Sequence, residues 1–457
     1  MLFSAPLPYN SDATAIYAAI ADLPWAVWLD SGGRDRYDVL VAQPAVTLVT
    51  RGEQTEISDA DGIRHSSADP FSLLREHLGI PLEPIPGIKF AGGALGYWGY
   101  DLARRLSDMP SQAQDAEGLP EMAIGIYDWA LQLDHQQKTA QLISRNRYPQ
   151  TEKIIPQILS RLQGKHKPAA QDSFQVHGDI ISNFTRGSYD TAFAAVQAYL
   201  HAGDCYQINL AQRFSARASG NAFAAYCKLR QLSPAPYSAF LNLPQAQILC
   251  ASPESFLRVQ QGHVETRPIK GTRPSVADEQ QNALLLQDLK SNPKDRAENL
   301  MIVDLLRNDL GKNCVAGSVR VPSLFQVESY ATVHHLVSTV TGELAAGRDS
   351  IALLRDCFPG GSVTGAPKQR AMQIIEQLEP QRRGIYCGAI GYIGFDGNMD
   401  CNIAIRTLVF SDGEIRCWAG GGIVADSEVG AEYQETLDKA AAMLALLRQY
   451  GGADFGS

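Results

Sequence analysis

The chain has 457 residues, 45% of them hydrophobic, which suits one large domain or two to three ordinary ones. Its net charge of −9 argues against a nucleic-acid-binding surface, because such a surface needs a basic face. The sequence contains no run of about 18 apolar residues, so no membrane-spanning helix is expected. The N-terminus lacks the pattern of a signal peptide. The eight cysteines form no Cys-x-x-Cys pair and lie mostly in apolar runs, so the sequence predicts a cytoplasmic protein with reduced thiols.

Short strands and helices are expected to alternate through an N-terminal region, residues 1–165. Apolar runs predict strands at 25–29, 37–40 and 46–50. Polar and turn-forming residues predict a loop over 107–120, and residues 164–178 are interpreted as a linker. This linker would separate the N-terminal region from a second region, residues 166–457.

The second region is expected to begin with a helix and to end with a meander and a further helix. Ser188 fits an N-cap and Gly203 fits the end of that first helix. A strand is expected at 205–214, and three more, joined by Asp-Gly turns, at 389–395, 401–410 and 415–424. The final helix is expected over 432–449. Because strands and helices interleave without a regular βαβ rhythm, the sequence predicts a mixed α/β (α+β) fold with large, mainly antiparallel sheets.

A single lysine in the middle of the chain has the surroundings of a reactive amine. Lys270 lies between a Pro-Ile pair and a Gly-Thr pair, so it is expected at a stiff strand end beside a flexible turn. If a three-residue loop pairs Gln260 with Val264, then Glu254 falls opposite Lys270 on the same face of a hairpin. A two-residue loop would place them on opposite faces. Such a pair is either an idle ion pair or an acid beside a nucleophile.

Two pairs of carboxylates are spaced to share one face of a helix. Asp295 and Glu298 begin a helix expected over 295–310, and Glu432 and Glu435 begin the last helix. Acidic residues in a first turn are also favoured by the helix dipole, so each pair alone has an ordinary explanation. Two such pairs suit Mg²⁺, which takes one or two protein carboxylates together with water and substrate oxygens.

Three further segments suggest an anionic ligand. Residues 361–368 are expected to form a loop that enters a helix, whose free N–H groups make an anion site. The glycine-rich strand at 418–424 lets a ligand approach the backbone, and Arg406, in an apolar strand, needs an anion. A histidine such as His335 in an apolar run is more often structural. Because no nucleophile signature of a hydrolase is present, the chain shows no sign of hydrolysing glutamine.

Taken together, these segments resemble the chorismate-utilising enzyme family from about residue 188 to residue 446, with weaker agreement in the N-terminal region. The resemblance rests on collinear runs: Ala-Gly-Asp-Cys-Tyr-Gln at 202–207, Ser-Pro-Glu-Ser at 252–255, Ile-Val-Asp-Leu at 302–305, Arg-Asn-Asp at 307–309, Gly-Ala-Pro-Lys at 365–368, Glu-Thr at 435–436 and Lys-Ala at 439–440. It implies two large sheets forming a sandwich with helices outside, as in anthranilate synthase component I, and an active site between the sheets.

The resemblance also implies roles for individual residues. Glu298 and Glu435 would bind Mg²⁺, with Asp295 and Glu432 close by, although Asp295 stands where Glu is common. Substrate-binding residues carried over in this way are Gln207, Thr272, His335, Ser362, Tyr386, Arg406, Gly420, Gly421, Gly422 and Lys439. Among them Arg406, Tyr386 and the glycines would hold carboxylates, while Ser362 and His335 would line the ring pocket. Members that add water to chorismate carry Lys where this chain has Gln207, which argues against water as the nucleophile.

Lys270 distinguishes two branches of the family. The run Pro-Ile-Lys-Gly-Thr resembles the aminodeoxychorismate synthase branch, which implies that Lys270 attacks ring C2 while Glu254 protonates the departing C4 hydroxyl. Ammonia, supplied by a separate glutamine amidotransferase subunit, would then give 4-amino-4-deoxychorismate, a precursor of para-aminobenzoate and folate. The alternative is the anthranilate synthase component I branch, which usually has Ala at this position.

A second ligand is suggested near the N-terminus. Leu-Asp-Ser at 29–31 and Pro-Ala-Pro-Tyr at 234–237 resemble the tryptophan pocket of the family, with Ser31, Pro236 and Tyr237 as candidate contacts. If tryptophan binding were the whole function, as in a non-catalytic subunit, the carboxylate pairs would be unexplained.

Overall fold

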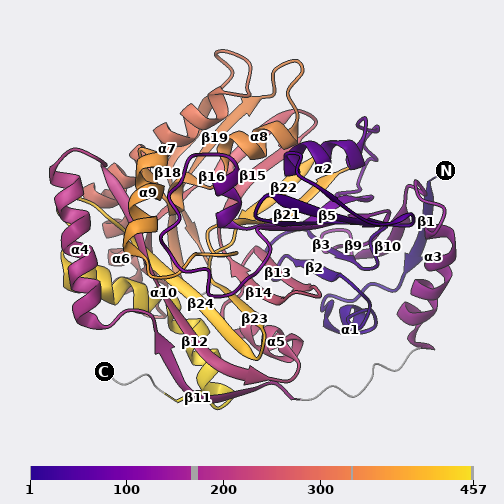
Figure 1. The fold of residues 1–457 in the computed structure, drawn as a ribbon, viewed down its shortest axis with the longest axis horizontal. Helices are drawn as coiled ribbons and strands as arrows, with labels where there is room; N and C mark the ends of the chain where they lie inside the picture. Colours follow the sequence, from indigo (N-terminus) through magenta and orange to yellow (C-terminus); the bar gives the residue numbers. More distant parts are fainter. Residues whose placement is uncertain (1, 166–172, 331–332, 454–457) are drawn as a thin grey trace.

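Two large sheets, packed face to face, form the body of the protein (Figure 1). The structure is a computed structural model and describes residues 2–165, 173–330 and 333–453. The first sheet has the order β1 (Phe3–Leu7), β10 (Thr139–Ser144), β9 (Trp129–Asp134), β3 (Tyr37–Val41), β2 (Ala26–Asp30), β13 (Tyr237–Asn242), β14 (Gln247–Ser252), β23 (Thr407–Ser411), β24 (Glu414–Ile423), β12 (Gln207–Ser219) and β11 (Gln175–Ser182), and β20 (Gly365–Ala366) pairs with β12.

The second sheet is built in the same antiparallel way. Its order is β17 (Ile269–Pro274), β19 (Val333–Glu343), β16 (His263–Arg267), β15 (Ser255–Gln260), β22 (Met399–Ile403), β21 (Ala389–Gly394), β7 (Gly93–Trp98), β8 (Met122–Tyr127), β4 (Val46–Arg51), β5 (Gln54–Asp59) and β6 (Gly62–Ser66), and β18 (Arg320–Ser329) pairs with β19. Every named strand pairing in both sheets is antiparallel, which confirms the predicted fold class.

Ten α-helices cover the sheets within the described residues. They are α1 (Thr14–Ala18), α2 (Pro70–Leu78), α3 (Thr151–Ser160), α4 (Arg186–His201), α5 (Ala222–Leu232), α6 (Glu279–Ser291), α7 (Pro293–Gly311), α8 (Ser350–Cys357), α9 (Lys368–Leu378) and α10 (Val429–Gln449). Helices α4, α6 and α9 lie toward the left of Figure 1, and α1 and α3 toward the right. None of the helices in the described part of the chain is long and apolar enough to span a membrane.

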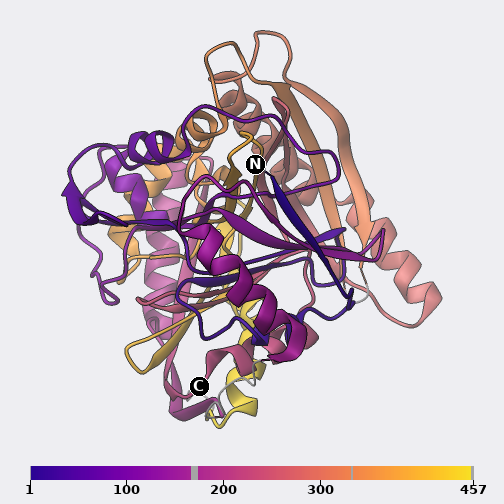
Figure 2. The same ribbon diagram turned by 90° about the vertical axis from the view of Figure 1, so that its right-hand side faces the viewer.

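The main core lies between the two sheets. Val27 and Val39 of the first sheet belong to the same buried cluster as Leu48 and Ile124 of the second. A separate cluster buries the outer face of the first sheet beneath α1, α3, α5 and α10. In Figure 2 helix α3 lies in front, across strands of the N-terminal region. Burial on both faces explains why many of these strands read as continuous apolar runs.

Strands from both predicted regions share each sheet. β2 pairs with β13 in the first sheet, and β7 pairs with β21 in the second. The boundary near residue 165 therefore does not separate two sheets, and it stays a prediction. Of the predicted linker, residues 166–172 lie outside the described residues, but the prediction was wrong from Gln175 onward, where β11 begins.

Two local predictions are corrected by the backbone. Residues 401–410 do not form one strand: β22 belongs to the second sheet and β23 to the first. The chain crosses between the sheets at 404–406, where Arg406 has a left-handed φ of 52°, which no continuous strand allows. Ser188 is not the N-cap of α4, because Thr185 accepts from its backbone N–H and the two residues form a capping box.

Candidate active site

Lys270 and Glu254 lie near each other, but not for the reason predicted. The hairpin has a two-residue turn and pairs Gln260 with His263, so the predicted pairing of Gln260 with Val264 was wrong. Lys270 lies on β17, which pairs with β19 rather than with β15. The two side chains converge on Ser362 instead, whose hydroxyl donates to Glu254 Oε1 at 2.8 Å. Lys270 Nζ donates to the backbone oxygen of the same serine at 3.4 Å.

Burial changes the proton affinities of both groups in opposite directions. Desolvation raises the pKa of Glu254, against the Ser362 hydrogen bond and the positive charge of Lys270. Desolvation lowers the pKa of Lys270, against the negative charges of Glu298 and Glu254. Both shifts are toward the forms that an acid and a nucleophile need, the protonated carboxyl and the neutral amine.

Three of the four candidate metal ligands face this pair from helices α7 and α10. Burial raises the pKa of Glu298, and Glu435 and Glu432 add to that rise, so the three carboxylates act on one another. Lysines lie among them: Lys439 Nζ is 2.5 Å from Glu435 Oε1, and Lys294 Nζ is 3.6 Å from Glu432 Oε1. Asp295 does not join this group, because it forms an ion pair with Arg273 at 2.8 Å.

The carboxylate set suits a hard cation that brings further oxygen ligands. Glu432 Oε2 is buried and has no hydrogen-bond partner within the described structure, so it can accept a cation. Glu298 and Glu435 supply the oxygen donors that Mg²⁺ prefers. Across the described residues, no group of three or more His, Cys, Asp or Glu side chains is placed to hold a metal ion unaided. Mg²⁺ would thus need water or ligand oxygens to complete its shell.

The glycine-rich end of β24 makes room for side chains on both faces. A Cβ at Gly421 would lie 2.9 Å from Glu432 Oε2, and one at Gly420 would lie 2.7 Å from Asn209 Oδ1. On the same face as Gly420, a Cβ at Gly422 would collide with the amide of Gln207. The glycines therefore let the α10 carboxylates approach on one face and two buried amides on the other.

The two amides beside the glycines have polar atoms that lack protein partners. Both amide atoms of Gln207 and Oδ1 of Asn209 are buried without a hydrogen bond in the described structure. Asn209 is not among the residues predicted from the sequence, although its position two residues after Gln207 puts it on the same face of the strand. Such unpaired buried groups are costly unless a ligand or water satisfies them.

Arg406 lies at the crossover between the sheets rather than within a strand. Its guanidinium donates to the backbone oxygen of Lys439, whose Nζ donates to Gly420 O at 3.0 Å. No carboxylate among the described residues forms an ion pair with Arg406, so its charge is available to an anion. Tyr386 stacks on Trp418 with ring centroids 6.1 Å apart and is electrostatically coupled to Arg406.

Other candidates lie at the edge of this group. Thr272 Oγ1 and His335 Nδ1 are 2.9 Å apart, and burial lowers the pKa of His335 to about 4, so its ring is neutral near pH 7. The predicted loop at 361–368 contains a 3-10 turn, Gly361–Val363, followed by β20. Lys368 begins α9, and its Nζ donates to Asp309 Oδ2 and Cys357 O, both at 2.6 Å. Its amine therefore has a structural role in joining α9 to α7 and α8.

A cavity lies between the two sheets, lined by residues other than those of this group. Its lining includes Ser31, Pro236 and Tyr237 together with Tyr392 and Asn402. It has about 450 Å³ of empty space, part of it open to solvent. The structure thus brings the three residues of the predicted tryptophan pocket together.

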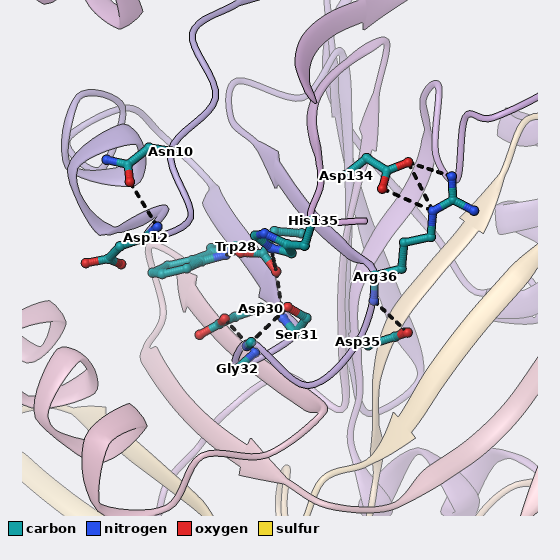
Figure 3. Close-up of polar contacts among 12 residues, drawn as sticks. Asn10, Asp12, Trp28, Asp30, Ser31, Gly32, Asp35, Arg36, Asp134 and His135 are labelled. Carbon is teal, nitrogen blue, oxygen red and sulfur yellow. Dashed lines mark hydrogen bonds and ion pairs between the residues drawn. The ribbon is translucent and has the colours of Figure 1, made fainter. Parts of the chain in front are cut away.

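The turn that carries Ser31 is fixed by two buried aspartates (Figure 3). Asp38 accepts from Ser31 N at 2.8 Å and from the Trp28 ring nitrogen at 3.3 Å, while Asp30 accepts from Gly32 N at 2.8 Å. Arg230 of α5 forms an ion pair with Asp30. The turn is therefore rigid before any ligand arrives, which lowers the entropic cost of binding.

Comparison with known proteins agrees with the fold described above. The aminodeoxychorismate synthase component 1 of Klebsiella aerogenes is 49% identical over 95% of this chain and 96% of its own length. That of Escherichia coli is 48% identical over the same shares. The crystal structure of anthranilate synthase component I from Streptococcus pneumoniae has a TM-score of 0.81 and 32% identity, covering 90% of this chain and 92% of that one. Residues 25–445 match the chorismate binding enzymes, and the chain belongs to that family.

Proposed function

We propose that the chain is component 1 of an aminodeoxychorismate synthase, which converts chorismate and ammonia into 4-amino-4-deoxychorismate. The observation that carries this proposal is the pair of half-buried Lys270 and buried Glu254, both of which contact Ser362. The two relatives at 48–49% identity bear that name, whereas the anthranilate synthase structure is 32% identical. Eight free cysteines within the described residues fit the predicted cytoplasmic location.

The proposed reaction proceeds in two displacement steps. The neutral amine of Lys270 attacks ring C2, the ring double bond shifts, and the C4 hydroxyl leaves as water with the proton of Glu254. Ammonia then adds at C4, the double bond shifts back, and the bond from C2 to Lys270 breaks. The Glu254 carboxylate takes up the proton that the ammonia nitrogen loses. Gln207 is a neutral amide, so it does not activate water as a base.

Binding and charge neutralisation fall to the surrounding residues. Arg406, Tyr386 and the backbone near Gly420 would hold one carboxylate of chorismate, and Ser362 and His335 would line its ring. Mg²⁺ bound by Glu298 and Glu435, with Glu432 nearby, would neutralise charge on the other carboxylate. Asp295 is better described as a structural partner of Arg273 than as a ligand.

The proposal is tested by identifying the product. The purified chain is incubated with chorismate, Mg²⁺ and an ammonium salt. The product is separated by chromatography and its mass is measured by mass spectrometry. The expected product retains the pyruvyl group and gains an amine at C4. Anthranilate as the main product would assign the chain to the alternative branch, and unchanged chorismate would reject both.

The rate is expected to fall at both ends of the pH range. Activity needs Glu254 protonated and Lys270 neutral, so it is lost as pH rises through the raised pKa of Glu254 and as pH falls through the lowered pKa of Lys270. Glu254→Gln should lower kcat by about 10²–10⁴-fold, because it removes the proton donor, and should abolish the alkaline limb of the kcat/KM profile. An unchanged alkaline limb in this variant would assign that limb to another group.

The isolated chain is expected to use ammonia but not glutamine. Its sequence contains no signature of an amidotransferase nucleophile, and the name component 1 of its relatives implies a second component. Product formation is compared with ammonium salt and with glutamine, before and after addition of a glutamine amidotransferase subunit. Glutamine-dependent product from a preparation shown to be free of that subunit would contradict the prediction.

The cavity lined by Ser31, Pro236 and Tyr237 is proposed to bind tryptophan. At a hundredfold excess over its Kd, L-tryptophan should stabilise the fold by about 2.7 kcal/mol, measurable as a rise in Tm. Tyr237→Ala should weaken this binding about tenfold through loss of an aromatic contact, whereas Ile63→Ala, at an exposed position on β6, should not. A Tm that does not respond to L-tryptophan would remove this assignment without touching the catalytic one.

A further inference from the structure

A buried arginine behind the candidate active site joins elements that are distant in the sequence. Arg383 lies between α9 and β21 and is only 2% exposed. We propose that Arg383 is a positioning residue, which holds the turn that carries Ser362, strand β12 and Tyr386 in the arrangement that the reaction needs. This inference rests on the proposed function, because it names a further residue for the same site.

The guanidinium uses its hydrogen-bonding fork on three partners. Nε and Nη2 donate to the two oxygens of Glu379 at 2.9 and 2.6 Å. Nη1 donates to Val363 O and Nη2 to Asn209 O, both at 2.8 Å. Arg383 Cζ also lies 5.7 Å from the ring centroid of Tyr386, and the Arg383 backbone oxygen accepts from Tyr386 N at 3.1 Å.

These partners are neighbours of the groups assigned to catalysis. Val363 follows Ser362, whose hydroxyl and backbone oxygen contact Glu254 and Lys270. Asn209 lies beside Gln207 on β12, and Glu379 also accepts from Ala211 N of that strand at 2.9 Å. A shift of the Val363 carbonyl would therefore move the acid and the amine together.

Stability alone does not account for a charge pair in this place. Replacing a buried ion pair by apolar residues is often neutral or stabilising, so such a pair is weak evidence for a stabilising role. The planar guanidinium donates to two backbone carbonyls and one carboxylate at the same time. The ammonium group of a lysine cannot reproduce this geometry. Arg383 touches neither the amine nor the acid, so its effect on the reaction passes through Ser362 and Tyr386.

A second, partly buried arginine offers a matched control, because its ion-pair partner Glu376 lies on α9. Arg104 forms an ion pair with Glu376 of α9 and binds Asp101 Oδ1 and Pro110 O, both at 2.9 Å. Glu376 in turn accepts from Gln112 N at 2.8 Å. These contacts hold the loop at 107–120, and none of them reaches the Ser362 turn or β12.

The test compares Arg383→Lys and Arg383→Met with Arg104→Lys and Arg104→Met. For each variant we would measure kcat and KM for chorismate with ammonia, the Tm, and backbone hydrogen exchange by mass spectrometry. Arg383→Lys should lower kcat about a hundredfold, since small misplacements of reacting groups cost about that much, with a smaller change in KM. Exchange should become faster in peptides covering 207–213 and 358–367. Arg104→Lys should lower Tm similarly, speed exchange only around 107–120, and keep kcat.

Three results would overturn the inference. A kcat of Arg383→Lys within about threefold of wild type, or an equal loss of kcat in Arg104→Lys, means that Arg383 has no special link to the site. Failure of Arg383→Lys to fold means that the residue is structural. A wild-type chain that does not turn over chorismate rejects the proposed function instead, and hydrogen exchange, which needs no turnover, still decides whether Arg383 holds the two segments.

Discussion

Replacing Lys270 by alanine is expected to remove a covalent intermediate and to lower amination of chorismate by at least about a hundredfold, because the nucleophile is lost. Wild-type protein given chorismate without ammonia should gain the mass of chorismate minus water, and peptide mapping should place this mass on Lys270. Since anthranilate synthases usually have Ala at this position, Lys270→Ala should retain a trace of activity and form some anthranilate or its amino precursor.

The control for this experiment is Lys290→Ala, at an exposed position near the end of α6. This variant should gain the adduct and retain the rate of the wild type. A wild-type chain that never gains mass, together with a fully active Lys270→Ala variant, would mean that Lys270 is an ordinary member of an ion pair. The burial of the amine and the lowered pKa of Lys270 would then need another explanation.

Glu298→Ala and Glu435→Ala are each expected to abolish turnover while the fold survives. A bound metal ion contributes several kcal/mol of charge stabilisation, which corresponds to a loss of at least about a hundredfold. The loss would not arise from protonation of Lys270, because Glu298 raises the pKa of that amine and its removal lowers it further. Mg²⁺ binding is measured by titration calorimetry, and turnover is measured as a function of Mg²⁺ concentration.

Asp295→Ala is the matched control for the metal ligands. It removes a carboxylate one turn before Glu298 on α7, but one that is paired with Arg273. We expect a loss of less than about tenfold, as for an ion pair of modest strength. Near-normal activity of Glu298→Ala or Glu435→Ala at ordinary Mg²⁺ would remove that residue from the metal site. A loss in Asp295→Ala equal to theirs would return it to the set of ligands.

The fold class could be predicted because strand and turn signals are local. The Asp-Gly turns after β21 and β23 and the apolar periodicity of α10 depend on residues close together in the chain. The break between β22 and β23 at 404–406 was not predicted, because an apolar run does not indicate to which sheet a strand belongs. Only tertiary packing places the crossover between the sheets at Arg406. The proximity of Lys270 and Glu254 was expected from a hairpin register that does not exist, and it arises from the distant Ser362 turn.

Some residues of the candidate site could likewise be predicted from the sequence, and others could not. Motif residues such as Glu298, Glu435 and Ser362 could be named from the sequence, because their spacing and neighbours resemble a family. Asn209 could have been found from its two-residue spacing to Gln207. Arg383 had no such signal, because its partners at 209, 363 and 379 are set by folding. Asp295 was grouped with the ligands since spacing places it on the same helix face, but spacing does not reveal its partner Arg273.

The sharing of both sheets by early and late strands has a consequence for how the protein is made. β2 finds its partner β13, and β7 its partner β21, only after long stretches of intervening chain have left the ribosome. Contacts of such high sequence separation form slowly, because the entropy of closing long loops is lost before the contacts stabilise them. Until then the edges of β2 and β7 are unpaired and apolar, which makes the nascent chain prone to aggregation. Folding of this enzyme is therefore completed late in synthesis, and a fragment that ends near residue 165 would lack the strands that close its sheets.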